Sequence, residues 1–203
     1  MKKIPTLFER TFDEKGRITG ITDTPKKGLE WVLDGEGYAT IKVDGSCCAI
    51  IDGKFYKRYD AKKGKPVPEG AIKCQEEADP VTGHLPCWVE CSIDNPSDKW
   101  FLKAYDELCR HVPQYLRDNA TYEAIGKHFN GNPYNLEDDI LICHGIYRID
   151  VDRSFEGLKE YLEKHAIEGI VFWKDNIPQC KIKRSDFGFK WPCEGAYYRN
   201  EHE

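Results

Sequence analysis

The sequence predicts a domain of the α+β class, in which antiparallel strands predominate and helices are few. Short runs rich in β-branched and aromatic residues recur along the chain, and Gly, Asp and Asn separate them, which is typical of antiparallel strands. Few segments show helical periodicity. With 203 residues and 40% hydrophobic content, the chain is long enough to bury one core. We therefore expect a single domain over residues 1–203.

The expected strands follow one another from the first third of the chain to its end. They cover residues 38–43, 46–51, 54–59, 86–91, 139–145, 167–173 and 179–184. Asp44-Gly45 separates the first two segments, and Asp52-Gly53 separates the next two. Because Asp-Gly favours two-residue hairpin turns, these dipeptides predict two hairpins.

Two segments have the apolar spacing of amphipathic helices. One covers about residues 97–111, and the other covers about 155–164 with Ser154 as its N-cap. Residues 62–85 are rich in Pro, Gly and charge, so they predict a long surface excursion. Loops of that length often carry function.

The charge of the chain limits its function classes. A net charge of -5 and a pI near 5.7 argue against a protein that coats nucleic acid non-specifically. Residues 54–65 nevertheless carry six basic residues against one acid, with aromatic residues interleaved. This pattern fits either a solvated hairpin or a local nucleic-acid-binding surface. No leader-like or membrane-spanning segment is evident, so we expect a cytoplasmic protein without membrane contact.

Nine cysteines are many for this length, but their number is odd and no export signal precedes them. We therefore expect reduced thiols and no disulfides. The closest approach to a zinc pattern is His84 with Cys87 and Cys91, but the tight Cys-x-x-Cys pairs of structural zinc sites are missing. Buried thiols, which behave as small hydrophobes, are the preferred interpretation.

The most informative motif is Lys42-Val43-Asp44-Gly45, a lysine at the end of an apolar strand. Alone it is weak, since a lysine beside a turn explains it equally well. Nucleotide transfer through a lysine needs a deprotonated amine, cations around the triphosphate and carboxylates for Mg²⁺.

Further along the chain, the groups that this chemistry needs follow in order. Carboxylates stand at Glu123 and at Glu168, which begins an apolar Glu-Gly run. Lys181 and Lys183 follow, and their spacing of two sends both side chains to one face of a strand. Unpaired charges are rarely buried, so charges in such apolar strands indicate a functional site.

This order of motifs resembles the covalent nucleotidyltransferase superfamily of ligases and capping enzymes. Over about residues 38–192 the chain resembles the RNA ligase 1 family in the strings KVDGSCC, KPVP, GHLPCW, EAIG, NGNPYNL, HG at His144, IEGIVF and FGFKWP. The resemblance implies the adenylation domain of ligases. DNA ligases and capping enzymes of the superfamily continue into an OB-fold, but only twenty residues follow Lys183 in this sequence, so we expect no C-terminal OB-fold. The resemblance also implies ATP as co-substrate, Mg²⁺ or Mn²⁺, and a monomer that joins RNA 5′-phosphate and 3′-hydroxyl ends.

The resemblance also implies roles for individual residues. Lys42 would form the lysyl-AMP, Glu168 would hold the metal, and Glu123 would lie near the ribose hydroxyls and offer a second metal ligand. The implied nucleotide site contains Ile41, Lys42, Asp44, Arg58, Glu123, Glu168, Lys181 and Lys183. The residue that orients pyrophosphate stays unassigned, with Arg10, Arg17 and Lys26 as alternatives.

Two other functions stay open at this point. An RNA-capping guanylyltransferase would use the same lysine chemistry with GTP. A non-catalytic module that binds nucleotides or RNA ends would keep the pocket without the reaction. The expected absence of an OB-fold counts against capping enzymes and DNA ligases, and the presence of every charged partner counts against a non-catalytic module.

Overall fold

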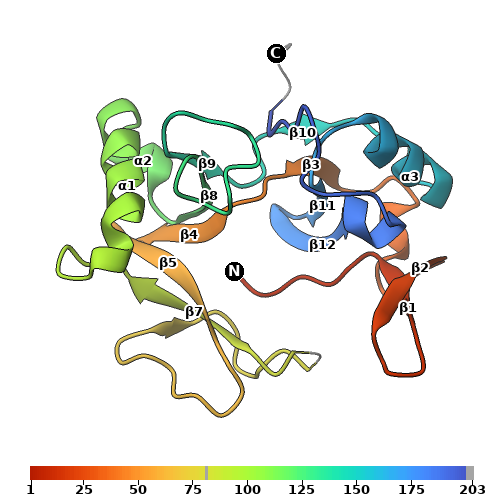
Figure 1. The fold of residues 1–203 in the computed structure, drawn as a ribbon, viewed down its shortest axis with the longest axis horizontal. Coiled ribbons are helices and arrows are strands. Elements are labelled where there is room, and N and C mark those ends of the chain that lie inside the picture. Colours follow the sequence, from red (N-terminus) through yellow and green to blue (C-terminus); the bar gives the residue numbers. More distant parts are fainter. Residues whose placement is uncertain (81, 200–203) are drawn as a thin grey trace. The chain divides into compact units, whose positions relative to one another are not determined.

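The computed structural model describes residues 1–80 and 82–199, and in this part of the chain the strands form antiparallel sheets flanked by a few helices (Figure 1). The expected α+β class is confirmed. The chain divides into two compact units: unit 1 comprises residues 1–3 and 44–144, and unit 2 comprises residues 4–43 and 145 onward. In the described residues, unit 1 contains one sheet and unit 2 contains two. The assignment of both units to one adenylyltransferase domain stays a prediction.

Unit 2 is built on a four-stranded sheet with the order β10-β3-β11-β12, in which every neighbouring pair is antiparallel. Its strands are β3 (Tyr38–Lys42), β10 (Arg148–Ile149), β11 (Gly169–Lys174) and β12 (Ile177–Lys183). A separate hairpin, which the sequence did not predict, consists of β1 (Phe8–Phe12) and β2 (Ile18–Pro25). Unit 2 also contains the short 3-10 helices η1 (Glu30–Val32) and η3 (Arg184–Phe187).

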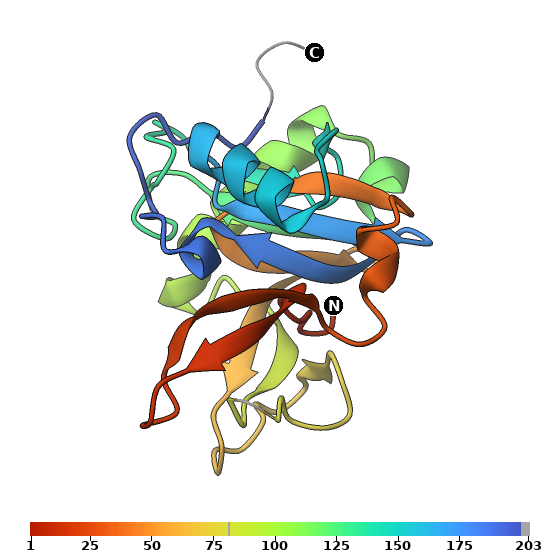
Figure 2. The same ribbon diagram turned by 90° about the vertical axis from the view of Figure 1, so that its right-hand side faces the viewer.

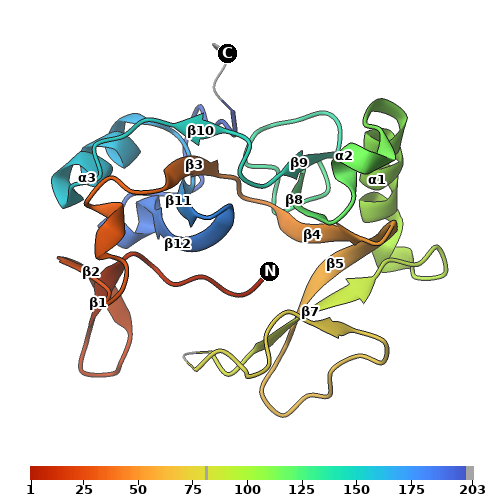
Figure 3. The same cartoon turned by 180° about the vertical axis from the view of Figure 1, so that it is seen from behind.

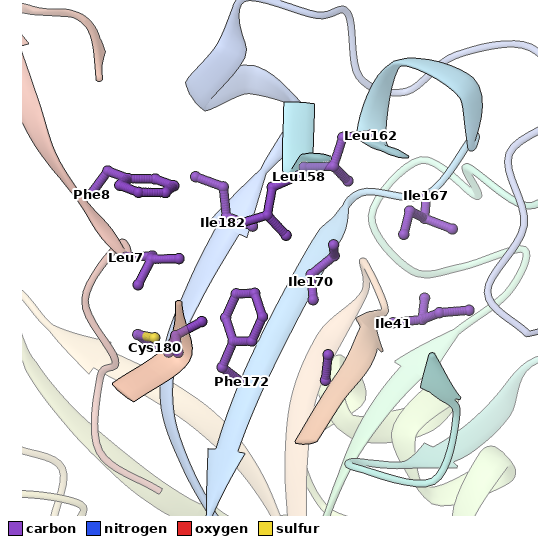
Figure 4. Close-up of a cluster of buried hydrophobic side chains, with 12 residues drawn as sticks. Leu7, Phe8, Ile41, Leu158, Leu162, Ile167, Ile170, Phe172, Cys180 and Ile182 are labelled. Carbon is purple, nitrogen blue, oxygen red and sulfur yellow. The ribbon is translucent and has the colours of Figure 1, made fainter. Parts of the chain in front are cut away.

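The helix α3 (Phe155–Lys164) lies over one face of the unit 2 sheet (Figure 2). It begins where predicted, because the Ser154 hydroxyl accepts a hydrogen bond from the Gly157 backbone N–H at 3.0 Å. Leu158 and Leu162, one turn apart on the helix, are fully buried. Figure 4 shows them among the apolar side chains that form the core of this unit.

Unit 1 is built on a six-stranded antiparallel sheet with the order β6-β7-β5-β4-β8-β9 (Figure 3). Its strands are β4 (Ser46–Ile51), β5 (Lys54–Ala61), β6 (Ile72–Lys73), β7 (Leu85–Glu90), β8 (Ala120–Ile125) and β9 (Ile140–Cys143). Strand β8, which carries Glu123, was not among the predicted strands. The residues that directly precede and follow β8, Asn119 and Gly126, both have positive φ.

The helix of unit 1, α1 (Lys99–His111), begins two residues later than the sequence predicted. The 3-10 turn η2 (Pro96–Asp98) precedes it, because the Asn95 side chain accepts from the Ser97 backbone N–H and caps that turn instead. A single helical turn, α2 (Gln114–Arg117), follows. Among the described residues, no helix is long and apolar enough to cross a membrane.

One of the two predicted hairpins is correct and the other is wrong. At Asp52-Gly53 both residues have positive φ, at 49° and 77°, and join β4 to β5 in a tight turn. At Asp44-Gly45 the chain instead leaves one sheet for another. A Cβ on Gly45 would lie 2.3 Å from the Ala124 carbonyl oxygen, so this glycine permits close approach to β8 rather than a hairpin turn.

The long polar excursion predicted over residues 62–85 contains little regular structure. Only β6 lies within it, paired with β7, and residue 81 lies outside the described part of the chain. Lys62, Lys63 and Lys65 are exposed there. The solvated character of the segment is therefore confirmed for its described residues.

Candidate functional site

Two strands of unit 2, β3 and β12, bring lysines to one end of the sheet on either side of β11. Gly169 on β11 is directly opposite Lys42 on β3 and directly opposite Lys183 on β12. Directly opposite residues share a face of the sheet, so Lys42 and Lys183 project to the same side. Lys181 lies two residues earlier on β12 and shares that face. The predicted convergence of Lys181 and Lys183 with Lys42 is therefore a consequence of strand register.

The neighbouring row of the sheet faces the opposite way. Ile41, Ile170 and Ile182 are directly opposite one another and belong to the buried core of unit 2. The Ile41 side chain thus lies on the face away from Lys42, and its backbone N–H donates to the Tyr147 carbonyl at 2.9 Å. This geometry therefore does not support a contact between the Ile41 side chain and the nucleotide.

Gly169 explains why the motif requires glycine after Glu168. A Cβ at this position would lie 2.3 Å from the Ile182 carbonyl oxygen, a backbone atom of the adjacent strand that cannot easily move away. Any larger residue would push β11 and β12 apart at the point where Lys183 is held beside Lys42. Glycine therefore maintains the spacing of the lysine cluster.

The side chain of Glu168 contacts the candidate nucleophile directly. The Lys42 Nζ donates to Glu168 Oε2 at 2.5 Å, and the two side chains are only 22% and 9% exposed. A charge-assisted hydrogen bond of this kind, largely out of solvent, fixes both groups in position. The structure thus pairs two residues that are 126 positions apart in the sequence.

Lys181 lies in an environment that disfavours its charged form. Burial, together with the positive charges of Lys42 and Lys183, lowers the pKa of Lys181 to about 8. The N-terminal segment pairs with the backbone at this position. The Lys181 N–H donates to the Pro5 carbonyl at 3.0 Å, and its own carbonyl accepts from the Leu7 N–H at 2.8 Å.

We expect Lys181→Met to raise the melting temperature at neutral pH by about 2 to 4 °C. An unfolded lysine has a pKa of about 10.4, whereas the pKa of Lys181 in the folded protein is about 8. At neutral pH the charged Lys181 side chain therefore destabilises the folded state relative to the unfolded state. That cost falls as the pH rises through 8 and the folded amine becomes neutral. Thermal unfolding of both proteins at neutral pH and at about pH 9.5 measures it. A gain that does not shrink with rising pH contradicts this explanation.

Among the alternatives for a pyrophosphate contact, Arg10 lies near the lysine cluster through Asp186. Its guanidinium lies 3.9 Å from Asp186 Oδ1, and the other oxygen of Asp186 accepts from the Lys183 backbone N–H at 2.9 Å. Arg10 Nε is buried without a hydrogen-bond partner. Arg17, by contrast, is exposed on the β1–β2 hairpin connection.

In unit 1, Glu123 is also fixed by its strand neighbours. Its Oε1 accepts from the Gly45 backbone N–H at 3.1 Å, and its Oε2 lies 2.9 Å from His144 Nε2. Cys47 on β4 is directly opposite Glu123 on β8, so the two side chains share a face. The sequence analysis gave neither Cys47 nor His144 a role. Their only signal was their place in the strings KVDGSCC and HG.

Asp44 and Arg58, the other predicted nucleotide contacts of unit 1, already have partners within that unit. The Asn130 side chain donates to Asp44 Oδ1 at 2.6 Å. Arg58 donates from Nε to Asp60 Oδ1 at 2.7 Å, and its guanidinium lies 5.8 Å from the centre of the Trp88 ring. The structure therefore brings Lys42, Glu168, Lys181 and Lys183 together in unit 2, and it places Asp44, Arg58 and Glu123 in unit 1.

Comparison with known proteins relates this α+β chain to RNA ligases. The family model described as RNA ligase 1 matches residues 61–202, which include Glu123, Glu168, Lys181 and Lys183 but not Lys42. RNA ligase 1 of Pongo abelii is 27% identical, with 81% of this chain and 72% of the relative covered. RNA ligase 1 of Rattus norvegicus is 27% identical (85% and 74% covered), and that of Danio rerio is 28% identical (78% and 70%). The chain belongs to the RNA ligase 1 family.

Proposed function

We propose that this chain is an ATP-dependent RNA ligase that works through a covalent AMP on Lys42. The observation that carries the proposal is the cluster of unit 2, in which Lys42 is paired with Glu168 and shares a sheet face with Lys181 and Lys183. Three lysines, only one of which is paired with Glu168, make this small surface suitable for an anionic ligand such as a triphosphate. That the substrate is RNA is proposed from the family of the chain.

The proposed reaction has three steps. The neutral amine of Lys42 attacks the α-phosphorus of ATP, a P–N bond forms, and the P–O bond to pyrophosphate breaks. The 5′-phosphate of an RNA end then attacks the same phosphorus, which transfers AMP to the RNA and releases Lys42. Finally a 3′-hydroxyl attacks the activated 5′-phosphate, which closes the strand and expels AMP.

The residues around Lys42 have separate parts in the first step. The positive charges of Lys181 and Lys183 disfavour the ammonium form of a neighbouring amine and attract the phosphates. Glu168, in contact with Lys42 Nζ, is placed to hold the amine in position and to accept its proton. A carboxylate that is nearly buried on a phosphate-binding face also suits Mg²⁺, whose charge would neutralise the phosphate oxygens.

The proposal is tested by incubating the protein with labelled ATP or labelled GTP and Mg²⁺, and then with a 5′-phosphorylated RNA. We expect AMP, but not GMP, to remain on the denatured protein, and we expect the RNA to be sealed. Label from GTP alone would favour a capping enzyme. Failure of both nucleotides to label the protein would contradict the covalent mechanism.

The basic segment of unit 1 is proposed to bind the RNA rather than ATP. We expect the combined variant with Lys62, Lys63 and Lys65 each changed to Glu to lose RNA affinity and to lower the slope of log affinity against log salt by about 2. These lysines are exposed, so their loss leaves the fold unchanged. AMP loading is expected to survive. Salt titrations of RNA binding and separate assays of AMP loading and sealing measure both effects.

A matched triple variant of exposed lysines elsewhere, with Lys15, Lys27 and Lys164 changed to Glu, controls for the change in net charge. Arg58→Ala provides the contrast, because Arg58 is assigned to the nucleotide and its loss is expected to impair AMP loading. The RNA assignment fails if the segment variant seals RNA normally, or if it impairs AMP loading as severely as Arg58→Ala.

A further inference from the structure

Three different metal-ligating side chains meet on one face of the unit 1 sheet. A sulfur from Cys47, a carboxylate oxygen from Glu123 and a ring nitrogen from His144 all lie within 4.8 Å of one another. Strand register produces this group. Cys47 is directly opposite Glu123, and Thr121, two residues earlier on β8, stands beside His144, which follows β9. Cys47 and Glu123 thus lie on adjacent strands, and His144 directly follows the next strand of the same sheet.

From this arrangement we propose that Cys47, Glu123 and His144 form a binding site for a borderline-soft divalent cation such as Zn²⁺. A tetrahedral Zn²⁺ with ligand distances of about 2.0 to 2.3 Å places its ligand atoms roughly 3 to 4 Å apart. The separations in this group therefore need little adjustment. Three protein ligands leave a fourth position for water, and the mixture of sulfur, nitrogen and oxygen disfavours Mg²⁺, which requires oxygen ligands.

The surroundings of the three ligands support a cation site. The Nδ1 of His144 lies 2.9 Å from Thr121 Oγ1, and the His144 N–H donates to the Thr121 carbonyl at 3.0 Å. These contacts orient the ring so that Nε2 points at Glu123, as outer contacts do for metal-binding histidines. Glu123 is buried and is held from its other oxygen by the Gly45 N–H at 3.1 Å.

The Cys47 sulfur completes the group from the strand next to Glu123. A bound metal deprotonates a coordinating thiol. Binding of Zn²⁺ would therefore release the thiol proton to solvent and form a metal–sulfur bond.

Cobalt is the direct probe of this site, because Co²⁺ replaces Zn²⁺ and absorbs in the near ultraviolet when bound to a thiolate. We expect the metal-free 203-residue protein to take up one Co²⁺ with such a band and to lose the band when Zn²⁺ is added. Cys47→Ser is expected to abolish the band. His144→Gln is expected to weaken Zn²⁺ affinity at least about tenfold in competition with a chromophoric chelator, as loss of an orienting or ligating group does.

Cys143→Ser is the matched control, because Cys143 is also partly buried and directly precedes His144. It is expected to keep the cobalt band. Circular dichroism shows whether each variant is folded, and His144→Gln tests the site if Cys47→Ser does not fold. Absence of a thiolate band in the folded wild-type protein overturns the proposal, as does a band that persists in Cys47→Ser. Neither measurement depends on ligase activity, so both stand whatever the outcome of the AMP-loading assay.

Discussion

Lys42→Arg is expected to reduce AMP loading at least about a thousandfold, as loss of a covalent nucleophile does. Arginine keeps the positive charge opposite Glu168, so the salt bridge and the fold are preserved. It cannot lose its proton in a protein, and therefore it cannot attack phosphorus. The measurement is retention of labelled AMP after denaturation, with folding checked by circular dichroism.

Lys174→Arg supplies the control for this variant. Lys174 lies on β11 of the same sheet, but its side chain is 40% exposed and is paired with Glu36 outside the lysine cluster. AMP loading is expected to be normal in this protein. Covalent AMP at wild-type levels on Lys42→Arg would show that another side chain is the nucleophile.

Glu168→Gln is expected to slow both AMP loading and strand closure by about a hundredfold, because each is a phosphoryl transfer that needs charge stabilisation and a metal-binding carboxylate. The amide has nearly the same shape as the carboxylate but carries no charge. It can still contact Lys42, so binding of ATP should be affected less than the reaction. Rates of AMP loading, and of sealing with pre-adenylated RNA, measure the two steps separately.

Glu156→Gln is the matched control, since Glu156 is exposed in the first turn of α3 in the same unit. The wild-type rate is also expected to depend on the Mg²⁺ concentration, and Glu168→Gln is expected to need more Mg²⁺. If Mg²⁺ had no effect on the wild-type rate, the metal role of Glu168 would have to be abandoned. If only one of the two steps slowed, a shared role would be wrong.

The parts of the fold that depend on local pattern were predictable from sequence. The α3 helix has its N-cap at Ser154, and the Asp52-Gly53 turn has the positive φ values that its residues favour. The spacing of Lys181 and Lys183 placed them on one face. Each of these features is determined by residues within a few positions of one another, so the sequence carries the signal directly.

Features that depend on distant pairing were not predictable. Asp44-Gly45 looks like a hairpin turn, but β3 pairs with β11 and β4 pairs with β8, so the chain changes sheet there. The same applies to the site. The sequence does not show that Glu168 contacts Lys42 directly, or that His144 lies beside Glu123, because the register of strands more than 20 positions apart decides both.

The location of AMP on the wild-type protein tests the central claim most directly. Lys181 is the alternative candidate for the nucleophile, because its pKa of about 8 makes its neutral form accessible near neutral pH. After incubation with ATP and Mg²⁺, the protein is digested and the modified peptide is sequenced by tandem mass spectrometry. We expect one AMP per chain, on Lys42. AMP on Lys181, or no adduct from a protein that nevertheless seals RNA, would contradict the account.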